Sequence, residues 1–155
     1  MKYLLAVSAL LLMASSASAQ DGWTKEEQEA GVKRYEFTRR VPAGKPRVLE
    51  DAIYLNADCT IIEDIETTIT KEPQHGSATI ETHQRNPSYP KDSVRAKCNE
   101  RKVKSQQLIY KPALNFIGDD EFEVEVLGSN GMVSQYTYHI KVVGPSKGGR
   151  TDLRP

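Results

Sequence analysis

The chain has 155 residues, and its 21 Lys and Arg side chains balance 21 Asp and Glu side chains. A formal net charge of zero argues against a general nucleic-acid-binding protein, because such proteins carry a basic excess. Hydrophobic residues make up 38% of the chain, which suits one domain of ordinary size with a modest core of its own.

The first 19 residues have the pattern of a secretory signal peptide. Lys2 supplies a positive start, an apolar run from Leu4 to Met13 follows, and positions 17–19 hold the small residues that precede a cleavage site. The apolar run has about ten residues, whereas a helix that crosses a bilayer needs roughly 20. We therefore expect cleavage near Ala19, no transmembrane segment, and a periplasmic or secreted mature chain.

A polar segment, residues 20–31, precedes the predicted domain, and a loose tail, residues 144–155, follows it. Between them, residues 32–143 contain short runs rich in Val, Ile, Thr, Tyr and Phe, separated by Pro and Gly. Without a helix long enough for a crossover, about seven such runs predict an all-β fold, a single antiparallel β-sandwich. The predicted strands are 35–41, 48–55, 65–70, 77–82, 107–111, 122–127 and 132–143.

The last two predicted strands form the clearest pair. Phe122, Val124 and Val126 alternate with glutamates, which is typical of a half-buried strand. Asn130 and Gly131 then suit the tight turn of a hairpin. In the returning strand Tyr136, Tyr138, Ile140 and Val142 share the inward face, so Thr137, His139 and Lys141 face solvent. The acidic cluster between positions 119 and 125 could suggest a calcium site or a catalytic carboxylate pair, but its glutamates alternate on the outward face of the strand and are interpreted as a solvated face.

Two cysteines, Cys59 and Cys98, remain after the signal peptide. Export places them in an oxidising compartment, and a metal site or a catalytic thiol pair would need closer spacing or a nearby histidine cluster. The sequence therefore predicts one disulfide that closes a loop of about 40 residues.

A connection from His83 to Ser105 is long for a compact domain and includes Cys98. The predicted disulfide would clamp it, and a clamped loop loses less entropy on binding. Its Tyr and Arg side chains are the types that dominate interface hot spots. The alternative is a solvated connection whose charges keep the chain soluble. The candidate contact residues are Asn86, Tyr89, Arg95, Lys97 and Arg101.

Transition-metal and catalytic sites have little support in the sequence. His75 and His83 are weak metal-ligand candidates, because a two-histidine site without a third ligand is incomplete. No GxSxG, SxxK or HExxH motif occurs, and we predict no catalytic residues and no cofactor.

Three short motifs follow one another in the second half of the chain, ahead of the closing hairpin. The matching residues are Pro73, His75 and Gly76, then Tyr110 and Pro112, then Phe116, Gly118, Asp120 and Phe122. This succession resembles the cadherin-like or immunoglobulin-like repeat domains of exported bacterial proteins. The resemblance implies an immunoglobulin-like sandwich in which the glycines allow close backbone contacts and Asp120 accepts hydrogen bonds from loop amides. The Asp that the family places after the strand is missing near Val126, so calcium bridging between repeats is not expected.

These observations favour an exported, non-enzymatic binding or interaction module of the cell envelope, with an acidic or peptide-like partner. One alternative is an immunoglobulin-like protease inhibitor that presents the segment Asn86–Pro90 to an active site. A less favoured alternative is a periplasmic metal-binding protein that uses His75 and His83. The sequence leaves the identity of the partner and the oligomeric state open.

Overall fold

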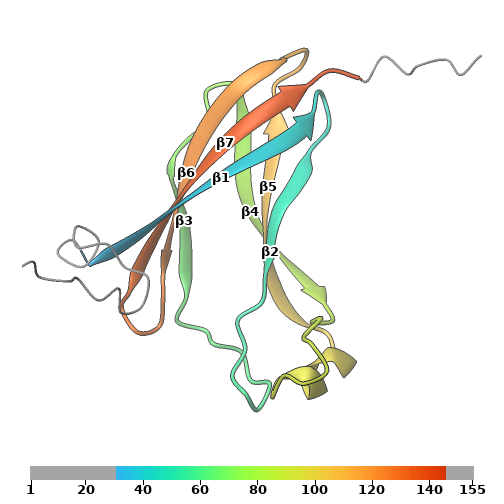
Figure 1. Cartoon of the computed structure of the whole chain (residues 1–155), viewed down its shortest axis with the longest axis vertical. Coiled ribbons are helices and arrows are strands. Elements are labelled where there is room, and N and C mark those ends of the chain that lie inside the picture. Colours follow the sequence, from blue (N-terminus) through green and yellow to red (C-terminus); the bar gives the residue numbers. More distant parts are fainter. Residues whose placement is uncertain (1–30, 146–155) are drawn as a thin grey trace, which may run out of the picture.

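A computed structural model describes residues 31–145, and this part of the chain is built from strands (Figure 1). The predicted signal peptide, residues 20–30 of the polar segment and residues 146–155 of the tail lie outside the described residues. No helix among residues 31–145 is long and apolar enough to cross a membrane. The elements are β1 (Val32–Pro42), β2 (Arg47–Ala52), β3 (Glu66–Lys71), β4 (Gly76–Arg85), the 3-10 helix η1 (Ala96–Glu100), β5 (Val103–Pro112), β6 (Gly118–Leu127) and β7 (Val133–Val143).

The seven strands of the described residues form two sheets, with the order β1-β7-β6-β3 in one and β2-β5-β4 in the other. The predicted all-β sandwich of about seven strands is thus confirmed. The groups β2-β5-β4 and β3-β6-β7 correspond to the two strand groups of an immunoglobulin-type sandwich. One pair departs from the antiparallel prediction, because β1 runs parallel to β7 from Val32 beside Val133 to Pro42 beside Val143.

Four strands, β1, β4, β5 and β6, are longer than predicted, and the long connection between β4 and β5 is shorter. β4 continues to Arg85 and β5 begins at Val103, and these two residues pair with each other. The residues after position 81 in β4 are polar on both faces and mostly exposed, so no apolar alternation marks them in the sequence. Pairing with β5 through backbone hydrogen bonds extends the strand, and the connection covers residues 86–102.

Aromatic rings from both sheets stack at the centre of the main core. Tyr110 and Phe122 are fully buried, with ring centroids 5.9 Å apart and planes inclined by 4°. Tyr138 stacks on the other side of Phe122 at 5.0 Å, and Ile140 and Val142 continue the buried face of β7. The predicted inward face of this strand is therefore confirmed.

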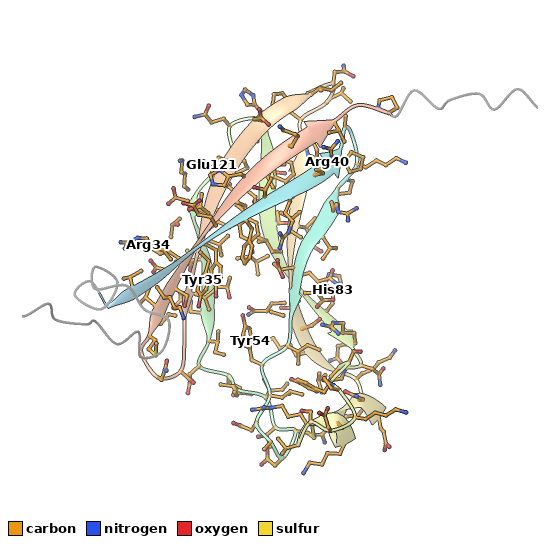
Figure 2. All side chains as sticks on the ribbon, viewed as in Figure 1. Arg34, Tyr35, Arg40, Tyr54, His83 and Glu121 are labelled. Carbon is orange, nitrogen blue, oxygen red and sulfur yellow. A yellow bond between two sulfur atoms is a disulfide. The ribbon has the colours of Figure 1, made fainter. Side chains whose placement is uncertain are left out.

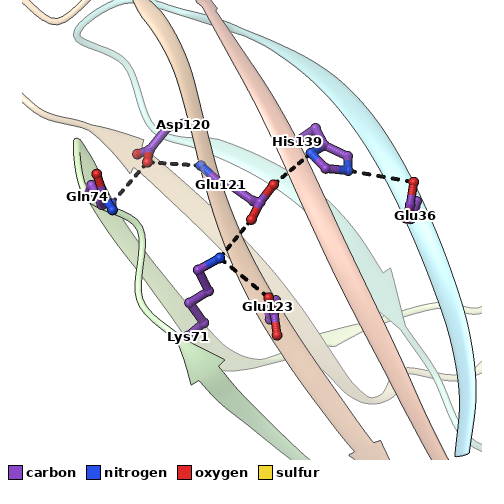
Figure 3. Close-up of polar contacts among 7 residues, drawn as sticks. All are labelled: Glu36, Lys71, Gln74, Asp120, Glu121, Glu123 and His139. Atoms are coloured by element: carbon purple, nitrogen blue, oxygen red, sulfur yellow. Dashed lines mark hydrogen bonds and ion pairs between the residues drawn. The ribbon is translucent and has the colours of Figure 1, made fainter.

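Asp120 joins the turn between β3 and β4 to the core at the end of the sandwich where the sheets meet. Its carboxylate accepts a hydrogen bond from the backbone N–H of Gln74 at 2.9 Å (Figure 3). It also accepts hydrogen bonds from the backbone N–H of His75 at 3.0 Å and from the Tyr110 hydroxyl at 2.8 Å. Burial, together with the adjacent Asp120 carboxylate, raises the pKa of Tyr110. The predicted role of Asp120 is thus confirmed.

The other predicted motif residues lie in the β3–β4 turn and between the end of β5 and the start of β6. A Cβ atom on Gly76 would lie 2.6 Å from the Lys111 carbonyl oxygen, so only glycine fits there. Gly118 has a φ of +147°, a backbone conformation that residues with a side chain rarely adopt. Phe116 is half-buried and stacks on the His75 ring at 4.3 Å. Pro73 and Pro112 are buried beside them.

Candidate binding surface

A disulfide between Cys59 and Cys98 closes the opposite end of the sandwich, as predicted. It joins the connection between β2 and β3, residues 53–65, to the connection between β4 and β5, residues 86–102. Both cysteines are buried in a small cluster with Leu55 and Val103, separate from the main core. We call the segment 86–102 the clamped loop, because a covalent bond ties it to the opposite connection.

The connection between β2 and β3 turns tightly to present Cys59. Leu55 pairs with Ile61, and the Cys59 backbone has a φ of +73°. The Asp58 carboxylate accepts hydrogen bonds from the Thr60 hydroxyl at 2.7 Å and from the Thr60 backbone N–H at 3.0 Å. These bonds lower the pKa of Asp58. Side-chain bonding of this kind stabilises a backbone conformation that non-glycine residues seldom adopt.

Two of the predicted contact arginines hold the clamped loop in place. The Arg95 Nε donates a hydrogen bond to the Leu55 carbonyl at 2.8 Å, and the Arg101 guanidinium donates to the Cys59 carbonyl. Hydrogen bonds from charged donors are among the stronger ones in proteins. Both guanidinium groups therefore reinforce the connection that the disulfide makes.

Tyr89 and Asn86 are also bound within the loop itself. Asn99 accepts the Tyr89 backbone N–H through its Oδ1 and donates its Nδ2 to the Tyr89 carbonyl, both at 2.9 Å. The Asn86 amide donates to the Asn99 carbonyl at 2.9 Å. The Tyr89 ring packs against the small disulfide cluster. The segment Asn86–Pro90, named above for protease inhibition, is thus bonded to η1, with Ser88 and Pro90 among its exposed residues.

The outward side of the clamped loop carries a different set of residues. Val94 is 71% exposed, and Lys91 and Lys97 near it in the sequence are exposed as well. Lys97 is the one predicted contact residue that stays fully on the surface without a hydrogen bond to the loop among those described. Val94 and Lys91 were not predicted; the one available signal was that Val94 is the single large apolar residue between Pro90 and Cys98. We call Lys91, Val94 and Lys97 the outer triad.

Charges of opposite sign lie on the two connections. Residues 86–102 hold five basic and two acidic side chains, whereas residues 53–65 hold three acidic side chains and no basic one. The charge of Lys97 contributes to the lowered pKa of Asp58, after the larger effect of the Thr60 hydrogen bonds. The basic character of this end therefore belongs to the clamped loop.

His75 and His83 do not form a shared site. His75 precedes β4 and His83 lies within it, so the extended strand separates them by about 26 Å. At this separation the two weak metal-ligand candidates cannot bind one ion together. His83 pairs instead with Glu81 at 3.4 Å. No group of three metal-ligating side chains occurs among residues 31–145.

A second polar region covers the outer face of the larger sheet. Lys71 contacts Glu121 at 2.7 Å and Glu123 at 3.5 Å, and His139 contacts Glu121 at 3.0 Å and Glu36 at 3.8 Å (Figure 3). The Lys71 hydrogen bond lowers the pKa of Glu121. A hollow of 470 Å³ lies beside this network, and the side chains of the network are paired with one another. The predicted outward placement of these glutamates is confirmed.

Comparison with known proteins adds little to this geometry. No protein-family model matches the chain, and no curated protein is similar to it. One solved structure that it resembles is a 2,6-sialyltransferase from Photobacterium sp. JT-ISH-224, crystallised with CMP and lactose, at 10% identity and a TM-score of 0.28. The match covers 74% of this chain and 18% of the sialyltransferase. At this TM-score the likeness supports no conclusion on fold or activity.

Proposed function

We propose that the protein is an exported binding module of the cell envelope, and that the outer triad on the clamped loop is its contact surface. The proposal rests on the different roles of two sets of side chains in this loop. Tyr89, Arg95 and Arg101 hold the loop against its own fold, while Val94 and Lys97 remain exposed. A loop ordered in advance loses less conformational entropy on binding, which favours affinity.

The chemistry of the outer triad favours an acidic, peptide-like partner. Along the chain the exposed Val94 lies between the exposed Lys91 and Lys97, and one exposed acidic residue, Asp92, lies in the same stretch. The segment therefore offers an apolar contact with an excess of positive charge nearby. Apolar groups at the centre of an interface with charges at the rim are common in protein complexes. The rim charges would speed association with an acidic partner and make the rate depend on salt.

The disulfide supports the exported location within this proposal. Disulfides persist in the periplasm and outside the cell and are rare in the cytosol. The predicted signal peptide points in the same direction. Membership in the exported cadherin-like or immunoglobulin-like domains belongs to the same proposal, with the Asp120 arrangement in its support.

A capture experiment with matched variants tests the proposed surface. We would cross-link the tagged chain in its native envelope and compare the wild type with Val94→Asp/Lys97→Glu. The control is Leu114→Asp/Lys45→Glu, which makes the same changes at the opposite end, where Leu114 is 85% exposed. We expect a partner that the wild type and the control retain and the loop variant loses. Equal capture by all three proteins would contradict the proposal.

A further inference from the structure

A cavity of 180 Å³ lies between the two sheets, away from the clamped loop. Phe37, Tyr136 and Tyr138 of the larger sheet form one wall, and Ala52 and Ile80 of the smaller sheet lie opposite. Tyr54, just after β2, also lines the cavity, and Figure 2 places it in the space between the sheets. The cavity therefore has aromatic rings of the larger sheet on one side and small or aliphatic groups of the smaller sheet on the other, with the Tyr54 side chain between the sheets.

The cavity exists because the two sheets separate toward the disulfide end (Figure 1). Where the sheets are closer, the stacked rings of Tyr110 and Phe122 fill the interior. Farther along, the smaller sheet contributes Ala52, the last residue of β2, and a methyl side chain fills little of the space between the sheets. The aromatic rings at this end of the main core therefore border an unfilled space.

A few polar groups lie at defined positions around the apolar cavity. Glu50 lines the cavity with a side chain that is 43% exposed, and Arg39 pairs with it at 2.6 Å across the two sheets. The Thr67 hydroxyl donates to the Gln106 amide oxygen at 2.9 Å and satisfies both groups. Burial raises the pKa of Tyr54 and of Tyr138, so both hydroxyls stay neutral at physiological pH. Such a mixture of apolar walls and few polar groups is typical of ligand sites.

We propose that this cavity binds a small, uncharged aromatic molecule with one ring and a hydroxyl or N–H donor, of the size of a cresol. The volume supports this size, because an apolar cavity of about 150 Å³ accommodates benzene. The aromatic wall offers stacked or edge contacts to a ring. The Glu50 carboxylate at the rim can accept a hydrogen bond from the hydroxyl or N–H group of the ligand. The proposal is independent of the outer triad, since no residue of that triad lines the cavity.

A nuclear magnetic resonance titration with p-cresol tests this site. We expect saturable shifts of the Ile80 and Val126 methyl signals, with half-saturation at about 1 mM or below. Toluene, which lacks the donor, should bind about tenfold more weakly, because a hydrogen bond to a charged acceptor is lost. The anion 4-methylbenzoate should bind more weakly still, since it carries like charge toward Glu50.

Two variants distinguish the cavity from other sites. Ala52→Leu places a larger side chain in the cavity and should abolish the p-cresol shifts, while a cooperative thermal transition shows that the variant is folded. Glu50→Gln should reduce the preference for p-cresol over toluene. Leu114→Gln, at the opposite end, should bind like the wild type. Unchanged p-cresol shifts in the Ala52→Leu variant, or no saturable shifts in the wild type, would overturn the proposal.

The experiment also tests whether the one tryptophan of the chain, Trp23, competes for the cavity. It lies outside the described residues. Binding of p-cresol should be the same in the wild type and in Trp23→Ala if the cavity takes an external molecule. A tenfold gain of affinity in Trp23→Ala would mean that the chain's own indole occupies the cavity, and it would overturn the assignment of a free ligand.

Discussion

The two ends of the sandwich are stabilised in different ways. At the end that contains Asp120, both sheets pack against the stacked rings of Tyr110 and Phe122, and the Asp120 carboxylate joins the β3–β4 turn to this core. At the other end the sheets separate, and the Cys59–Cys98 disulfide connects the long loops. Packing stabilises the first end, and a covalent bond stabilises the second.

This difference shows how one small domain can combine a rigid core with a surface loop whose exposed side chains take no part in core packing. The buried cluster around the disulfide contains few residues, and guanidinium-to-carbonyl hydrogen bonds from Arg95 and Arg101 supplement it. The clamped loop is therefore ordered without large side chains of its own in the main core. Its outer triad remains exposed.

Removal of the central ring should have the largest effect. Phe122→Ala is expected to lower the free energy of unfolding by about 3–5 kcal/mol, because it removes buried apolar surface and leaves a cavity. The matched control is Phe116→Ala at the same end, where the ring is half-buried and the loss should be less than half as large. Denaturant unfolding measures both. Equal losses would contradict the assignment of the core to the Phe122 stack.

Removal of the disulfide should have a comparable or slightly smaller effect, confined to the other end. The Cys59→Ala/Cys98→Ala variant frees a loop of about 40 residues and should lose about 3–4.5 kcal/mol of stability according to the chain-entropy model. The near-ultraviolet circular dichroism of the aromatic core should persist below the unfolding transition. Loss of that signal together with the disulfide would show that the two ends are not separately stabilised.

A smaller, pH-dependent effect on stability is expected from Asp51, near the end of β2. Asp51 of β2 accepts Gln107 Nε2 at 3.0 Å and pairs with Arg85 at 2.8 Å, which joins three strands. Burial acts to raise the pKa of Asp51, but the hydrogen bonds from Gln107 and Arg85 outweigh it and lower the pKa from 3.8. A lowered pKa stabilises the fold above the unfolded value, and this contribution disappears as the pH falls through the folded value.

Asp51→Asn should therefore cost about 1 kcal/mol near neutral pH, a value reduced by partial exposure. The difference between wild type and variant should shrink as the pH falls below about 4. Denaturant unfolding at a series of pH values measures it. A difference that stays constant to low pH would assign the effect to packing rather than to charge.

Much of the fold could be predicted because it has local signals. The alternation of Phe122, Val124 and Val126 indicates a strand with one buried face, and Gly76 and Asp120 mark a turn with strict local requirements. The parallel partner of β1 could not be predicted, because a period of two residues carries no information on strand direction. The polar ends of β4 and β5 likewise depend on their pairing, which leaves no apolar pattern in the sequence.

The sequence analysis selected the segment of the candidate surface, but of the three side chains in the outer triad it named only Lys97. Composition selected Tyr89, Arg95 and Arg101 as contact residues, yet their partners are carbonyl oxygens and buried atoms that have no sequence signature. These contacts hold one side of the loop against the rest of the fold. Val94 lies on the other side and is therefore exposed. The cavity between the sheets depends on how far the sheets diverge, which no local pattern encodes.

Hydrogen exchange at backbone amides tests most directly whether the disulfide orders the clamped loop. The informative amides are those of Tyr89, bonded to Asn99, and of Cys98 or its replacement, bonded to the Arg95 carbonyl at 2.8 Å. We predict protection of both amides in the wild type and loss of protection in Cys59→Ala/Cys98→Ala, while the amides of Phe122 and Ile140 remain protected. Rapid exchange of the loop amides in the wild type, or equal protection in both proteins, would contradict the account.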